Sequence, residues 1–249
     1  MSDEKDKGKW AKKGPPPALP ERRRRVVFDV GETDTRATPT RVKTGKNRTA
    51  QSARWLERQL NDPYVHKARA DGWRARSAYK LIELDEKFNL IPNHGRVVDL
   101  GAAPGGWTQV VARRGAAALV GIDLLPMDPI EGATIIQGDF LAEGMEDQLV
   151  DLLGGAPNLV MSDMAANTVG HKQTDHLRTA ALSEAAAHFA MRVLAPGGAF
   201  VTKMFQGGTE TEILTLLKQS FKDVRHAKPP SSRAESVELF MVATGFKGK

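Results

Sequence analysis

The sequence predicts an α/β fold in which seven strands form a mostly parallel sheet covered by helices on both faces. Three observations favour this class. After Pro92, short apolar segments typical of strands alternate with longer segments of helical composition. A glycine-rich turn at 101–106 directly follows the first of these strands. The last two strand-like segments have only a loop between them, so we expect an antiparallel pair at one side of the sheet.

The strands are predicted from short runs of apolar and β-branched residues, and the helices from the longer stretches between them. The helix at 176–194 is rich in alanine and ends before Pro196-Gly197-Gly198, which is a strong helix-stop sequence. The predicted strands are 96–100, 118–124, 133–137, 158–163, 199–205, 224–227 and 237–244. The predicted helices after Pro92 are 106–114, 142–153, 176–194 and 210–221.

A basic helical segment at 51–90 is expected to precede this core, which spans 94–249. A short helix is predicted at 52–60, a turn at 62–65, and one or two helices at 66–88, where apolar residues recur near helical spacing. Residues 51–80 hold 7 basic and 3 acidic residues, so positive charge continues into folded structure.

The net charge of the 249-residue chain is +6, and the basic excess lies at its N-terminus. Residues 1–50 hold 14 basic and 7 acidic residues, whereas residues 81–249 hold 15 basic and 20 acidic residues. The first 50 residues also contain Pro15-Pro16-Pro17 and few large apolar side chains. They are predicted to be a disordered basic extension, because ordering them would bury little apolar area. Such an extension either keeps the protein soluble or binds a polyanion.

Composition excludes several classes of protein. The absence of cysteine excludes disulfides, a thiol nucleophile and cysteine-based zinc sites. No run approaches the roughly 18 consecutive apolar residues of a membrane helix, and the N-terminus has no apolar core typical of a secretory signal. The six histidines show no metal-binding spacing such as H-E-x-x-H. We therefore expect a cytoplasmic protein with no metal and no membrane association.

The glycine-rich turn and two later acidic residues predict a cofactor site. Parallel sheets bind ligands at the carboxyl ends of their strands, and here the turn, Asp123 and Asp139 end successive strands. Asp123 can accept hydrogen bonds from a ribose diol, and Asp139 from an adenine amine. The spacing Gly101-x-x-x-Gly105-Gly106 departs from the G-x-G-x-x-G of dinucleotide sites. S-adenosylmethionine, which has no phosphates, therefore fits better than NAD.

Polar residues in otherwise apolar strands predict a second site. Asp163, Lys203 and Glu238 each interrupt or end such a strand, and an isolated buried charge is costly. Each should therefore be paired or should face a cleft at a strand end. Lys80 lies on the basic helical segment, where an alternative role is a solvated charge that pairs with Glu83.

Taken together, these motifs resemble the FtsJ/RlmE family of 2′-O-ribose methyltransferases that act on large-subunit ribosomal RNA. The resemblance covers roughly residues 62–247. It is carried by Arg76–Leu81, Asp99–Trp107, Asp123–Asp128, Gln137–Phe140, Ser162–Ala165, Pro196–Gly198, Lys203–Gly207, Lys228-Pro229 and Ser231–Arg233. It implies a catalytic tetrad of Lys80, Asp163, Lys203 and Glu238. It implies cofactor contacts at Gly105, Trp107, Asp123, Asp139 and Asp163.

The resemblance also implies the reaction, which is methyl transfer from S-adenosylmethionine to a uridine 2′-hydroxyl in the A-loop of 23S rRNA, on the large ribosomal subunit. Lys203 would be the general base or would orient the hydroxyl. The protein is expected to be a monomer. Alternatives are a 2′-O-methyltransferase of tRNA or mRNA, or an RNA-binding ribosome assembly factor. RNA is expected between two basic surfaces, formed by Arg54, Arg58, Lys67, Arg69, Arg74 and Arg76 and by Lys222, Arg225, Lys228 and Arg233.

Overall fold

A single seven-stranded sheet organises the protein. The computed structural model describes residues 56–166, 171–205 and 210–248. The strand order is β3-β2-β1-β4-β5-β7-β6, and β7 runs antiparallel to both of its neighbours. The other neighbouring strands pair in parallel. The strands are β1 (Arg96–Leu100), β2 (Ala118–Asp123), β3 (Thr134–Gln137), β4 (Leu159–Ser162), β5 (Ala199–Phe205), β6 (Phe221–Ala227) and β7 (Glu238–Phe246).

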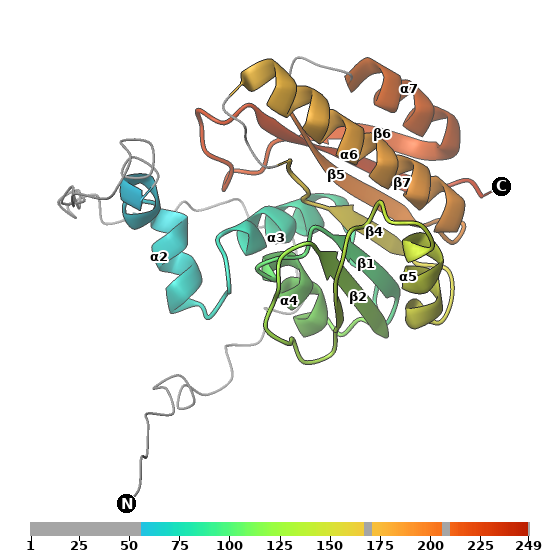
Figure 1. Ribbon diagram of the computed structural model, residues 1–249, viewed down its shortest axis with the longest axis horizontal. Coiled ribbons are helices and arrows are strands. Elements are labelled where there is room, and N and C mark those ends of the chain that lie inside the picture. The colour runs from blue at the N-terminus through green and yellow to red at the C-terminus, as the bar shows by residue number, and fades with distance from the viewer. Residues whose placement is uncertain (1–55, 167–170, 206–209, 249) are drawn as a thin grey trace, which may run out of the picture.

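Helices cover both faces of the sheet, which confirms the predicted fold class (Figure 1). α5, α6 and α7 pack on one face, and α4 packs on the other together with α3. α2 precedes α3 in the chain. The helices are α2 (Pro63–Ala70), α3 (Ser77–Phe88), α4 (Gly106–Arg113), α5 (Met145–Leu153), α6 (Lys172–Val193) and α7 (Glu210–Ser220).

Alternation along the strands divides the core into two layers. Within β1, Val98 and Leu100 belong to the layer under α5, α6 and α7, whereas Val97 belongs to the layer under α3 and α4. Phe200 and Val201 of β5 divide in the same way. This is the period of two that a strand buried on both faces requires. The odd-numbered positions of β1, β4 and β5 therefore face α3 and α4.

The predicted turn at 62–65 is wrong, because these residues begin α2. Asp62 is the N-cap residue, and its Oδ1 accepts a hydrogen bond from the Tyr64 backbone N–H at 3.0 Å. Pro63 follows at the first helical position, where its lack of an N–H costs nothing. An Asp-Pro pair starts a helix as readily as a turn, and the charged residues that follow obscured the helical pattern.

Several predicted boundaries also move. α6 begins at Lys172 rather than at 176. His171 is its N-cap residue, and the His171 side chain accepts a hydrogen bond from the backbone N–H of Thr174. α5 begins at Met145, after Gly144 with a φ of 77°. β6 begins at Phe221, directly after α7. The predicted extension at 1–50 lies outside the described residues, and the domain division remains a prediction. Within the described residues, no helix is long and apolar enough to cross a membrane.

Candidate active site

The carboxyl edge of the sheet gathers the acidic and basic residues predicted to be functional. Asp123 ends β2, Asp139 follows β3, and Asp163 follows β4. Lys203 lies near the end of β5, which runs parallel to these strands. Glu238 joins them because β7 is antiparallel, so that its first residue pairs with Phe205 at the end of β5. The reversal of one strand thus brings a residue from the far end of the chain to this edge.

Lys203 and Asp163 form a largely buried ion pair. The Lys203 Nζ lies 2.9 Å from Asp163 Oδ1 and also donates to the Asp163 backbone carbonyl. The backbone carbonyl of Lys203 accepts from the Ser183 hydroxyl of α6 at 2.7 Å, which fixes this part of β5 from the opposite face. The ammonium therefore has a defined position at the strand edge.

Lys80 and Glu238 form a second buried ion pair. The Lys80 Nζ lies 2.7 Å from Glu238 Oε1, and it stands 5.6 Å from the centre of the Phe240 ring. The alternative partner, Glu83, instead accepts hydrogen bonds from Ser231. Lys80 is thus not the solvated helical charge that its position on a basic helix also allowed.

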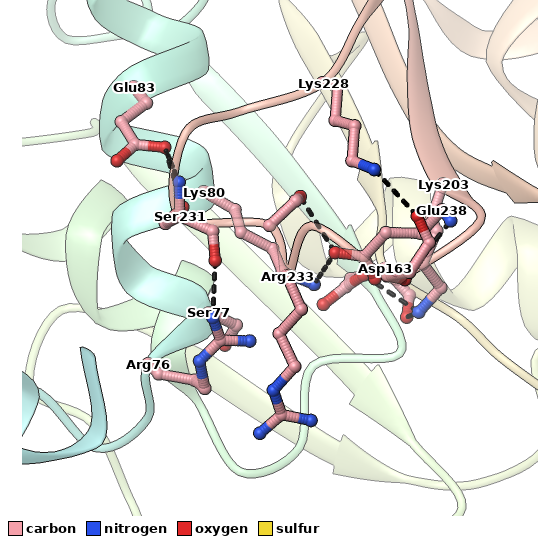
Figure 2. A network of polar contacts seen from close by, with 12 residues as sticks. Arg76, Ser77, Lys80, Glu83, Asp163, Lys203, Lys228, Ser231, Arg233 and Glu238 are labelled. Atoms are coloured by element: carbon pink, nitrogen blue, oxygen red, sulfur yellow. Dashed lines mark hydrogen bonds and ion pairs between the residues drawn. The ribbon is translucent and has the colours of Figure 1, made fainter. Parts of the chain in front are cut away.

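The two ion pairs lie close enough to interact (Figure 2). Burial would raise the pKa of Asp163, but the charges of Lys203 and Lys80 outweigh burial and hold that pKa below its ordinary value. One lysine from each ion pair therefore lowers the pKa of Asp163. Two lysines and two acidic residues thus face each other in a largely buried place, where each charge has a partner of opposite sign.

Asp123 and Asp139 are held by the backbone around them. Asp123 Oδ2 accepts from the Ala103 N–H at 2.9 Å, and Oδ1 accepts from the Leu125 N–H at 2.8 Å. The carboxylate at the end of β2 thereby fixes the glycine-rich turn after β1. Asp139 is exposed, and its Oδ1 accepts from the Leu141 N–H at 2.9 Å. Both carboxylates border the same strand edge.

Gly105 and Trp107 offer backbone rather than side-chain contacts. Gly105 is the N-cap residue of α4 and has a φ of 102°, a conformation that favours glycine, and a Cβ there would crowd the Ile130 side chain at 2.7 Å. The Trp107 ring is buried against Phe240, and its Nε1 donates to the Ser77 carbonyl at 2.9 Å. A ligand at this helix end would therefore meet the first backbone N–H groups of α4.

Asp99 is a buried acidic residue beside the glycine-rich turn, and the sequence predicts no individual role for it. It lies in β1, is fully buried, and its Oδ2 accepts from the Thr108 hydroxyl at 2.6 Å. Its Oδ1 has no hydrogen-bond partner among the described residues. Burial, together with the charges of Asp163 and Asp123, raises the pKa of Asp99 to about 7. An Asp inside an apolar strand, directly before the glycine-rich turn, is the signal that could have found it.

A family match covers the region that contains both ion pairs. Residues 73–246 match the family model described as FtsJ-like methyltransferase. The chain belongs to this family. Two relatives named Ribosomal RNA large subunit methyltransferase E are similar to it. That of Novosphingobium aromaticivorans is 63% identical over 210 residues, covering 84% of this chain and 95% of that protein. That of Granulibacter bethesdensis is 62% identical over 206 residues, covering 83% and 90%.

A solved structure is also similar. A chain from Plasmodium falciparum, described as a ribosomal RNA methyltransferase, matches with a TM-score of 0.63 and 31% sequence identity. The match covers 71% of this chain and 100% of that one. The FtsJ-like methyltransferase fold predicted from the motifs is therefore confirmed, whereas the roles of the individual site residues remain predictions.

In this FtsJ-like chain, several of the basic residues expected to bind RNA hold other parts of the protein. The Arg74 guanidinium donates to the carbonyls of Asp128 and Pro129 at 2.7 and 2.6 Å. Arg76 and Arg233 both contact Asp62, each at distances near 3 Å. Arg225 pairs with Asp223, and Lys228 donates to the carbonyls of Ala234 and Ser236. The Lys67 ammonium lies over the Tyr79 ring. Arg54 lies outside the described residues.

The described residues contain no group of three or more His, Asp or Glu side chains that could hold a metal ion. The acidic residues at the strand edge are instead paired with lysines or with backbone N–H groups. Any charged ligand at this edge would meet carboxylates, ammonium groups and backbone donors.

The raised pKa of Asp99 predicts a pH dependence of stability. Between about pH 4 and pH 7 the folded state binds more protons at Asp99 than the unfolded state does, so the free energy of unfolding falls as pH rises. Asp99→Asn keeps an oxygen for Thr108 but cannot ionise. We expect the variant to gain stability relative to the original protein as pH rises through this window, measured by urea unfolding at pH 5 and pH 8. Parallel pH profiles for the two proteins would contradict the assignment.

Proposed function

We propose that this FtsJ-like protein transfers a methyl group from S-adenosylmethionine to the ribose 2′-hydroxyl of a uridine in 23S rRNA. The observation that carries the proposal is the meeting of two Lys–carboxylate pairs at the strand edge beside the glycine-rich turn. A hydroxyl nucleophile needs groups that orient it and accept its proton, and a methyl donor needs a separate cradle. In this proposal, the ion pairs at the strand edge would orient the hydroxyl, and the glycine-rich turn beside them would hold the methyl donor.

The residues around the turn fit a cationic cofactor. Asp99 is a buried carboxyl group, one oxygen of which has no hydrogen-bond partner within residues 56–166, 171–205 and 210–248. Asp123 and Asp163 are near enough to raise its pKa. The charge of Asp123, which helps to raise the pKa of Asp99, would favour a ligand that carries positive charge. Gly105 would let the ligand approach the turn closely, and Trp107 would contribute its backbone N–H. Asp123 would accept from the ribose diol, and Asp139 from the adenine amine. When bound, S-adenosylmethionine supplies a methyl group on a positively charged sulfur.

The tetrad would act on the hydroxyl that receives the methyl group. We assign Lys203 to the 2′-oxygen, which it orients and polarises as an ammonium or deprotonates in its neutral form. Asp163 holds Lys203 through its carboxylate and its backbone carbonyl. Lys80 and Glu238 would bind the ribose and the adjoining phosphate. Holding the oxygen in line with the methyl group can supply most of the rate, since effective molarities reach on the order of 10⁵ M.

The substrate is proposed from the relatives and from the charge of the chain. Both relatives are named as methyltransferases of large-subunit ribosomal RNA. Basic residues on the segment before Lys80 would neutralise phosphates, which gives affinity that falls with salt. We propose that the protein acts as a cytoplasmic monomer on the A-loop of 23S rRNA, either free or in the large ribosomal subunit.

Methyl transfer can be tested directly. The protein is incubated with labelled S-adenosylmethionine and, in separate reactions, with large subunits, free 23S rRNA, tRNA and mRNA that lack the modification. We expect label in large-subunit RNA, at one ribose 2′-oxygen located by resistance to alkaline cleavage. Label only in tRNA or mRNA would replace the proposed substrate with one of the alternatives. Binding of large subunits without transfer to any RNA would support an assembly factor.

A further inference from the structure

One face of α3 is directed at the loop between β6 and β7. Arg76, Lys80 and Glu83 are spaced by four and three residues, so they lie along the same side of the helix. Arg76 donates to the Ser231 carbonyl, Lys80 contacts Glu238, and Glu83 accepts from Ser231. Figure 2 shows these side chains between the helix and the loop. The helix that carries a predicted catalytic lysine thus also binds the loop that leads to Glu238.

Three consecutive residues of the 228–237 loop bind acidic side chains on other parts of the protein. Ser231 gives both its backbone N–H and its hydroxyl to Glu83 Oε2, at 2.8 and 2.7 Å. The hydroxyl of Ser232 donates to Glu238 Oε1 at 2.9 Å, the same oxygen that contacts Lys80. Arg233 donates twice to Asp62 Oδ2. Ser231 and Ser232 are buried, so these contacts are shielded from water.

These contacts form a closed network of hydrogen bonds and one ion pair. It runs from Glu83 to Ser231, along the backbone to Ser232, then to Glu238, to Lys80, and back along α3 to Glu83. Strand pairing alone fixes only the backbone of Glu238, at the first residue of β7. The hydroxyl of Ser232 fixes its carboxylate, and Glu83 fixes the loop that presents this hydroxyl.

We propose that Glu83 is a positioning residue, which docks the 228–237 loop on α3 and thereby holds Glu238 against Lys80. This inference rests on the proposed methyltransferase function. Glu83 does not touch the reacting atoms in this arrangement, and its effect passes through Ser231 and Ser232. Displacement of a catalytic group by about 1 Å can cost up to about 10²-fold in rate, so loss of this contact should reduce turnover measurably.

The test is a double-mutant cycle on the full chain with large-subunit RNA at saturation. We expect Glu83→Ala to lower kcat about 10-fold, because Lys80 and Glu238 lose their alignment. The affinity for S-adenosylmethionine, measured by calorimetry, should stay the same. In a Glu238→Ala background, Glu83→Ala should change kcat less than about twofold, because the aligned group is already absent. Glu83→Gln, which keeps an acceptor oxygen for Ser231, should restore much of the activity.

Glu86→Ala is the matched control, since Glu86 is an exposed carboxylate on the same helix. It should leave kcat unchanged, and thermal melting shows whether each variant is folded. Unchanged kcat in Glu83→Ala, or equal losses from Glu83→Ala with and without Glu238, would overturn the positioning role. If the original protein transfers no methyl group to any RNA, the proposed function fails instead, and the two failures are distinguishable.

Discussion

Lys203→Ala is expected to remove nearly all methyl transfer while the protein remains folded and still binds S-adenosylmethionine. Lys203 is the tetrad member held by two contacts from one residue, the carboxylate and the backbone carbonyl of Asp163. Its loss removes the group assigned to the 2′-oxygen. We expect kcat to fall by about 10²–10⁴-fold, the range that a positioned acid or base contributes. The measurement is single-turnover transfer of labelled methyl to large-subunit RNA.

Two comparisons make this result specific. Lys218→Ala removes an exposed lysine of α7, which belongs to neither of the expected RNA-binding surfaces, and should leave kcat unchanged. Calorimetry should give nearly the same cofactor affinity for Lys203→Ala as for the original protein, because the turn and Asp123 are untouched. Turnover close to that of the original protein would remove Lys203 from the mechanism.

Asp123→Ala is expected to act in the opposite way, through cofactor binding. Its carboxylate is proposed to accept from the ribose diol, and it also holds the glycine-rich turn through the Ala103 N–H. Hydrogen bonds to a charged group contribute about 1.5–3 kcal/mol each, which corresponds to roughly 10- to 100-fold in affinity. We expect a loss of S-adenosylmethionine affinity of about that size, measured by calorimetry.

Asp123→Asn separates the two roles of this carboxylate. The amide oxygen can still accept from Ala103 and keep the turn in place, whereas the charge and one acceptor oxygen are lost. We expect an affinity between those of Asp123→Ala and the original protein. Equal affinity in all three proteins would show that the diol assignment is wrong. A loss in Asp123→Ala that Asp123→Asn fully restores would show that Asp123 acts only by holding the turn.

The periodicity of the sequence was enough to predict the sheet and the faces of several site residues. Alternating positions along β5 put Lys203 on the same side as Val201, which lies in the core layer under α3 and α4, and Lys203 pairs with Asp163 at the strand edge. The ends of β2, β3 and β4 likewise gave the places of Asp123, Asp139 and Asp163. These predictions succeed because a strand has a period of two and because parallel strands share one carboxyl edge.

Residues that can cap a helix predict secondary structure less reliably than strand periodicity does. Asp62-Pro63 was predicted as a turn, although the same residues cap α2. Besides capping α2, Asp62 contacts both Arg76 and Arg233 through its buried carboxylate. Arg76 and Arg233 are far apart in the sequence, so no local sequence pattern predicts that both contact Asp62. The sequence predicts RNA contacts for both arginines, because a basic residue in a sequence does not reveal which acidic group it pairs with.

The sequence by itself determined the fold class, the family and the set of charged residues at the strand edge. Motif spacing and strand alternation are local properties, and both can be read along the chain. The tertiary structure alone decided which charges pair. It joined Lys80 to Glu238 rather than to Glu83, because antiparallel β7 and the loop before it dock on α3. It also left one oxygen of Asp99 without a hydrogen-bond partner in the part of the chain that the structure describes. Pairing across 158 residues depends on how separate elements pack, which no local pattern contains.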